Sequence, residues 1–144
     1  MVIGFLAGCG SAPTPAPPVA VNESMNIRYG DRVLQLQAIN REARALVKAG
    51  KSDLASDLIQ KGESLIPELL SVPRPTLPAM EAASDLDDLY GRMFLTNHHW
   101  GWARLMFQKN LSRWNSWRPV TPETARRLQE ARDAIAECDR HILQ

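Results

Sequence analysis

The sequence lacks long apolar runs, a strong net charge and recognisable catalytic motifs. None of its apolar stretches approaches the roughly 20 residues that a helix needs to span a bilayer. The formal net charge of +1 creates no field that would attract nucleic acid. No GxSxG, SxxK or phosphate-binding glycine loop is present. We therefore expect a protein that is not an enzyme, uses no cofactor and binds no nucleic acid.

The sequence also lacks the surroundings that a metal site would need around its histidine pair, His98 and His99. Adjacent histidines on a helix point about 100° apart and do not easily share one ion. No HExxH, CxxC or nearby cysteine supplies further zinc ligands. We interpret residues 97–99 as a turn between two helices and predict no metal site.

Helix-forming residues dominate the sequence after residue 25. Ala, Leu, Arg, Glu and Gln are frequent there, and β-branched runs are few. This composition predicts an all-α domain over residues 26–144 with about five helices. We expect them at about 26–49, from 52 to the region of 67–70, from a start between 77 and 84, at 100–115 and at 122–142.

Several residues mark the expected helix ends. Gly50 is a natural stop for the first helix, and Ser52 is expected to cap the second. Pro67 is expected to end or kink that second helix. Thr121 and Pro122 are a cap and a first helical residue. The carboxylates near the start of the third helix suit the positive end of its dipole (Glu81, Asp85, Asp87 and Asp88).

The two cysteines lie in different surroundings. Leu6-Ala7-Gly8-Cys9 follows an apolar start and precedes a Pro/Ala-rich stretch. The tetrapeptide resembles the lipobox of bacterial lipoproteins, in which the cysteine is lipidated and becomes the first mature residue. No basic region precedes it, so we expect a longer signal upstream. Cys138 lies in an apolar helical stripe, and we expect it to be buried, structural and unpaired.

The lipobox resemblance implies how the N-terminal residues are divided. Residues 1–8 would be the remnant of a signal peptide, and Cys9 would carry the membrane anchor. Residues 9–25 would form a tether, extended at roughly 3 Å per residue where Pro and Ala alternate. The implied location is the bacterial cell envelope, lipid-anchored and facing the periplasm.

Two predicted helix pairs share a spacing pattern. Small and bulky residues recur at intervals of three, nine and four, first at Ala43, Leu46, Ala55 and Ile59, and then at Gly91, Phe94, Ala103 and Phe107. The pattern resembles the tetratricopeptide repeat, a helical hairpin of about 34 residues. Asn110 and Asn115 depart from the family pattern, and the proline loop forms an insertion.

The resemblance implies two hairpins, over residues 36–69 and 84–117, followed by a capping helix. A five-helix bundle without repeats is the alternative. Gly91 is expected where the third and fourth helices cross most closely, because glycine inside a helix otherwise lowers stability.

The tryptophans divide into two helical stripes. Trp100 and Trp114 share the core stripe with Ala103, Phe107 and Leu111. A neighbouring stripe mixes aromatic, apolar and basic residues and is predicted to bind a partner (Trp102, Met106, Lys109, Arg113 and Trp117). The alternative is that the basic side chains simply cover aromatic edges of the same protein.

The predicted partner follows from local charge. The segment 92–118 contains no acid, and the acids of 81–88 are expected to reach Arg113 or Arg118. Arg104 and Lys109 are expected to lack internal partners, which predicts an acidic partner. The expected function is a membrane-anchored helical protein–protein interaction module that binds a segment between helix pairs. A self-associating structural lipoprotein is the main alternative, and a small hydrolase or metalloprotein is a third.

Overall fold

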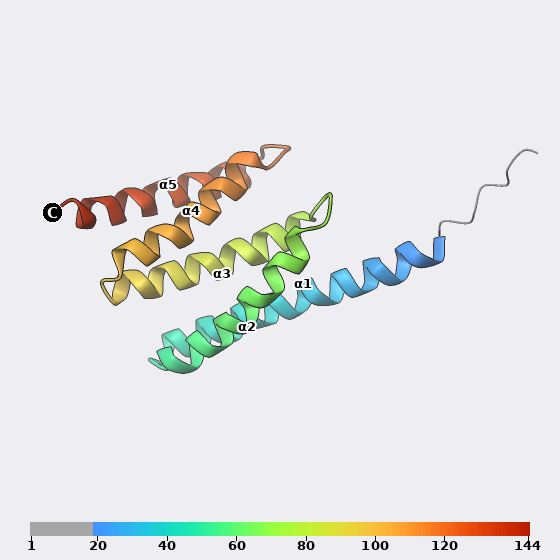
Figure 1. Cartoon of the computed structure of the whole chain (residues 1–144), viewed down its shortest axis with the longest axis horizontal. Coiled ribbons are helices and arrows are strands. Elements are labelled where there is room, and N and C mark those ends of the chain that lie inside the picture. Colours follow the sequence, from blue (N-terminus) through green and yellow to red (C-terminus); the bar gives the residue numbers. More distant parts are fainter. Residues whose placement is uncertain (1–18) are drawn as a thin grey trace, which may run out of the picture.

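The computed structural model describes residues 19–144, and within them the chain forms five α-helices and no strand. These are α1 (Val19–Lys48), α2 (Ser52–Leu70), α3 (Leu77–Thr96), α4 (Trp100–Ser116) and α5 (Pro122–Ile142) (Figure 1). The predicted all-α fold with five helices is confirmed. Cys9 and the start of the predicted tether lie outside the described residues. None of the helices described is long and apolar enough to cross a membrane.

Most helix ends lie close to their predicted positions, with two differences at the N-terminal side. α1 begins at Val19 rather than near Asn26, directly after the last of the N-terminal prolines. Ser52 is the first residue of α2 and not its cap, a position that Lys51 takes without a side-chain hydrogen bond.

The remaining helix signals act largely as expected. Gly50 adopts a φ of 75°, the left-handed conformation that favours glycine after a helix. α2 continues past Pro67 to Leu70. Thr121 accepts a hydrogen bond from the Thr124 amide and begins α5. α3 begins at Leu77, so its first turn contains no acid and the predicted role of the acids at the dipole end is wrong. Three of them form ion pairs instead (Asp85, Asp87 and Asp88).

The helices pack in sequence order. α1 pairs with α2, α3 packs on both and also pairs with α4, and α5 packs on α4. Figure 1 shows the two hairpins stacked side by side, with the N-terminal part of α1 projecting beyond the other helices. The main contacts therefore join helices that are neighbours, or next neighbours, along the chain.

The apolar core has two parts that share α3. One cluster joins α1, α2 and α3 around Leu36, Ile59 and Leu86. The other joins α4 and α5 around Phe107 and Cys138, with Phe94 of α3 packed against it. Cys138 is buried, as predicted, and forms no disulfide among residues 19–144.

Close helix approach depends on small residues at the crossings. A Cβ atom added at Gly91 would lie 2.8 Å from ring atoms of Phe107, so α3 and α4 are in close contact at this glycine. A Cβ atom at Gly62 would lie 2.7 Å from Leu86 Cδ2, so α2 and α3 also approach closely. Ala43, Ala55 and Ala103 are fully buried.

Candidate functional site

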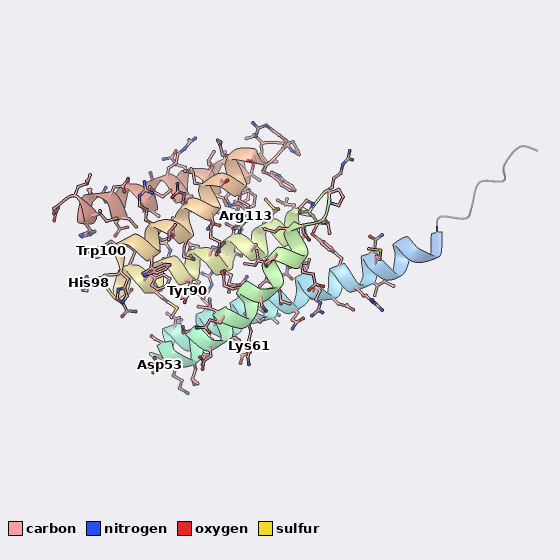
Figure 2. The ribbon with its side chains drawn as sticks, in the orientation of Figure 1. Asp53, Lys61, Tyr90, His98, Trp100 and Arg113 are labelled. Atoms are coloured by element: carbon pink, nitrogen blue, oxygen red, sulfur yellow. The ribbon has the colours of Figure 1, made fainter. Side chains whose placement is uncertain are left out.

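The predicted partner residues lie along α4 in different environments. Trp102 is 60 % exposed, and Met106 and Trp117 are half-buried. Lys109 is half-buried, whereas the side chain of Arg113 is only 8 % exposed. Figure 2 shows Arg113 near the end of α4 and Trp100 at its start. The predicted surface therefore has an exposed apolar end and a buried basic end.

The exposed end continues into a row of aromatic rings from α3. Trp102 stacks on Phe94 with 6.3 Å between ring centroids, and Phe94 stacks on Tyr90 at 4.4 Å. His99, in the predicted turn, meets Phe94 edge-on at 6.3 Å. Aromatic pairs of this kind are stabilised beyond what the burial of their surface area contributes. Trp102 is thus held in place while most of its surface stays in contact with solvent.

The basic end belongs to a cluster of charges between three helices. Lys109 Nζ lies 3.0 Å from Glu63 Oε2 of α2 and 2.8 Å from Asp87 Oδ1 of α3. Arg113 Nη1 lies 2.8 Å from the other Asp87 oxygen, in an ion pair without hydrogen-bond alignment. Asp87 is fully buried. We call Glu63, Asp87, Lys109 and Arg113 the ionic cluster.

The ionic cluster corrects one charge prediction and confirms another. Lys109 was expected to lack internal partners but has two, and Arg104 Nε also lies 2.6 Å from Asp139 Oδ1 of α5. Arg113 pairs with an acid of α3, as expected. Arg118 instead donates to the backbone carbonyls of Asn115 and Trp117.

The surroundings of Glu63 favour its protonated form. Burial and the neighbouring carboxylate of Asp87 raise the pKa of Glu63 to about 7, although Lys109 opposes the shift. Its Oε1 atom is buried without a hydrogen-bond partner among residues 19–144. Burial lowers the pKa of Lys109, but Asp87 and Glu63 more than offset this, and the net shift is upward. The cluster therefore holds two cations, one buried carboxylate and a carboxyl that titrates near neutral pH.

A second polar layer lies next to the ionic cluster. The Asn110 side-chain amide donates to the Ser84 carbonyl at 3.0 Å, and Trp114 Nε1 donates to Ser84 Oγ at 2.8 Å. Trp114 is buried, as predicted for the core stripe, together with Ala103 and Phe107. Trp100 and Leu111 of that stripe are only half-buried. These bonds fix the register of α3 against α4, which is a structural role.

The exposed residues of α4 are neutral, whereas the side chains of Arg104 and Lys109 are 37 % and 38 % exposed beside them. Each of the three cations of α4, Arg104, Lys109 and Arg113, pairs with an acid from another helix. The residues left exposed are all neutral and define the outer face of α4 (Gly101, Trp102, Leu105, Gln108, Ser112, Asn115 and Ser116). Leu105 is 48 % exposed and borders an open recess that is also lined by Gln108, Lys109, Ser112 and Arg113.

Sequence reasoning identified Trp102 but missed the rest of the outer face. The signal was present, because Gly101, Leu105, Gln108 and Ser112 are spaced by four, three and four, which places them on one helical stripe. Their lack of charge becomes informative only once the internal partners of the cations are known.

A recess on the other side of the molecule is lined by charged side chains from α1, α3 and α5. Arg127 pairs with Asp85 across it at 2.9 Å, and Arg44 and Glu130 also line it. Its volume of about 180 Å³ is below the range of about 300–1,000 Å³ that is typical of small-molecule sites. The recess therefore offers no pocket for a substrate of ordinary size.

The histidine pair lies in the predicted turn. His98 has a φ of 59° and packs edge-on against Trp100, with ring centroids 5.1 Å apart. Among residues 19–144, no group of three or more His, Cys, Asp and Glu side chains is placed to hold a metal ion. No family model, curated protein or solved structure matches this chain.

Proposed function

We propose that this protein is a membrane-anchored envelope lipoprotein that acts as a helical protein–protein interaction module. The observation that carries the proposal is the outer face of α4. It exposes Trp102 and Leu105 while every cation of the helix is paired internally. Depletion of charge and enrichment in aromatic residues are typical of the centre of a protein interface. Tryptophan is also among the residues that contribute most to binding energy.

The ion pairs change which partner we propose. The sequence predicts an acidic partner on the expectation that Arg104 and Lys109 lack internal partners, but both contact internal carboxylates. We therefore propose a partner surface that is apolar and uncharged, because an unpaired charge buried against this face would be costly.

Two further parts of the proposal rest on resemblance. The Leu6-Ala7-Gly8-Cys9 motif supports a lipid anchor at Cys9 on the periplasmic side of the envelope. The close approach at Gly91 and the buried small residues Ala43, Ala55 and Ala103 support tetratricopeptide-like packing of the two hairpins. A five-helix bundle with the same contacts is the alternative.

The experiment that tests the interaction is site-specific photocrosslinking in intact envelopes. A photoreactive residue at position 105 should give discrete crosslinked species, because that position lies on the outer face of α4. The same residue at position 54, an exposed leucine of α2, is the matched control and should give none. Equal crosslinking at both positions would refute a dedicated docking surface on α4.

The anchor is tested separately by fractionation. A Cys9→Ser variant should leave the membrane fraction or accumulate as an unprocessed precursor, because the acyl chains that hold a lipoprotein need this thiol. A variant that matures normally and remains membrane-bound would show that the lipoprotein assignment is wrong. That result would leave the α4 surface unaffected.

A further inference from the structure

The cations of α1 differ from those of α4 in lacking acidic partners within the chain. Arg41, Arg44 and Lys48 are exposed, and none of them forms an ion pair with residues 25–144, where α1 pairs Arg32 with Glu68 of α2 instead. Their spacings of three and four place them on one helical stripe. We call Arg41, Arg44 and Lys48 the basic stripe. It is free to meet negative charge from outside the chain.

The two acids of α1 lie away from the basic stripe. Residues 25–51 contain six Lys and Arg side chains and two acids, Asp31 and Glu42. At 100° per residue, these acids lie about 80–160° around the helix from the three cations. The basic stripe therefore presents positive charge on its own side of α1.

Exposed apolar side chains border the basic stripe. Ile27 is 61 % and Leu34 is 63 % exposed. Ile27, Leu34 and Arg41 follow one another at intervals of seven residues, close to two helical turns, and so lie on nearly the same side of α1. Apolar side chains beside Lys and Arg suit the boundary between lipid headgroups and acyl chains.

The proposed anchor at Cys9 and the basic stripe would meet a membrane at separate points. Cys9 precedes the start of α1 at Val19 by ten residues, which span at most about 35 Å. Arg41 follows Val19 by 22 residues, or about 33 Å along the helix. The anchor therefore keeps the start of α1 near the bilayer, and the basic stripe can attach its other end.

We propose that α1 lies along an anionic membrane surface, with the basic stripe on phospholipid headgroups and Leu34 at the boundary with the acyl chains. This rests on the proposed function only for the lipid anchor that brings α1 to the bilayer. α4 packs on α3 and α5, and Figure 1 shows α3 between α1 and that pair. The arrangement keeps α4 on the far side of α3 from the lipid, where its outer face can meet a protein partner.

Co-sedimentation of the full chain with lipid vesicles tests this contact. The chain carries Cys9→Ser, so that no acyl chain contributes, and residues 1–8 are the same in every variant. Phosphatidylcholine vesicles that contain phosphatidylglycerol should bind the chain about tenfold or more tightly than pure phosphatidylcholine, because each Lys or Arg near such a surface strengthens binding about fivefold. Raising the salt from about 0.05 to 0.5 M should remove this preference, since salt screens exposed charges.

Charge reversal identifies the side chains responsible. Arg41→Glu combined with Lys48→Glu should weaken binding to the anionic vesicles by about tenfold or more. Arg132→Glu combined with Arg140→Glu is the matched control, because both arginines are exposed on α5 and form no ion pair with residues 25–144. It should bind as the parent does. Arg41→Gln combined with Lys48→Gln removes the same charges without adding acids and should also weaken binding. Circular dichroism melts verify the fold of each variant.

An environment-sensitive fluorophore tests which side of the protein meets the lipid. A label on Ala38→Cys, at an exposed position of α1, should brighten with anionic vesicles, whereas a label on Ala136→Cys of α5 should not. Cys138 is buried in the folded chain and is protected from the label. Leu34→Ser should weaken vesicle binding severalfold, and Leu54→Ser, at an exposed leucine of α2, should leave it unchanged.

Three results would overturn the membrane contact: equal binding to neutral and anionic vesicles, equal losses in the α1 and α5 reversals, or equal signals at positions 38 and 136. An acidic protein as the true partner of the basic stripe would give the first of these.

The lipid anchor is judged separately, by fractionation of cells in about 0.5 M salt, which releases the α1 contact. If Cys9→Ser stays membrane-bound there while the vesicle preference holds, only the anchor is wrong. If Cys9→Ser is released and the vesicle preference is absent, only the α1 contact is wrong.

Discussion

Replacing Glu63 with glutamine should change how the stability of the protein depends on pH. Glutamine keeps an oxygen that can accept a hydrogen bond from Lys109, but it cannot ionise. Two charged groups from two helices face this side chain, Asp87 of α3 and Lys109 of α4. The substitution therefore removes one titratable group from the ionic cluster and leaves the side-chain volume nearly unchanged.

The sign follows from linkage between proton binding and folding. The pKa of Glu63 is raised to about 7 in the folded protein, from an ordinary value of 4.5. Proton binding therefore stabilises the fold fully below pH 4.5, and this contribution is lost as pH rises through about 7. A shift of that size corresponds to at most about 3 kcal/mol, and partial exposure to solvent reduces it to roughly 1–3 kcal/mol. The unfolding free energy of Glu63→Gln minus that of the parent should therefore be higher at pH 8 than at pH 5 by that amount.

Urea unfolding followed by tryptophan fluorescence measures this difference. Parent and variant are compared at pH 5 and pH 8, so that titrations common to both proteins cancel. Glu68→Gln is the matched control, because it makes the same change at an exposed carboxylate of the same helix. Its difference from the parent should be the same at both pH values. If the Glu63→Gln difference is also constant with pH, the account of the ionic cluster is refuted.

Other substitutions test the packing and the surface. Gly91→Leu should destabilise the fold by about 1–3 kcal/mol in thermal melts, because even a Cβ atom at this position would meet the ring of Phe107. Trp102→Ala should change unfolding free energy by less than about 1 kcal/mol, since the side chain is mostly exposed, while it reduces crosslinking at position 105. Asp87→Asn should cost about 3–5 kcal/mol in urea unfolding, because Arg113 then keeps a buried charge without its acid.

The sequence predicted what depends on local chemistry. Gly50 ends a helix because of its own backbone freedom, and Thr121 with Pro122 begins one through contacts within a few residues. The steric role of Gly91 was also predictable, because glycine inside a helix needs a reason. The five helices and much of the buried stripe of α4 followed from such signals.

The candidate site could be predicted only in part. Trp102 was predicted to bind a partner and is exposed, but the partners of Lys109 were not anticipated. Glu63 is far from Lys109 in the sequence and meets it only because the two hairpins stack in one register. Helical periodicity shows which residues share a face but not which face of another helix they meet. Which cations of α4 are neutralised depends on these contacts between helices, so the charge of its surface could not be predicted from helical periodicity alone.

The sequential packing of the helices has a consequence for folding kinetics. The main contacts join helices that are neighbours or next neighbours along the chain, and α3 takes part in both apolar clusters. Such a low contact order predicts fast folding, because little loop entropy is lost before contacts form. Two routes are available, one starting from α1–α3 and one from α3–α5, and both require α3. Mutations that weaken α3 should therefore slow folding, whereas those in α5 should mainly accelerate unfolding.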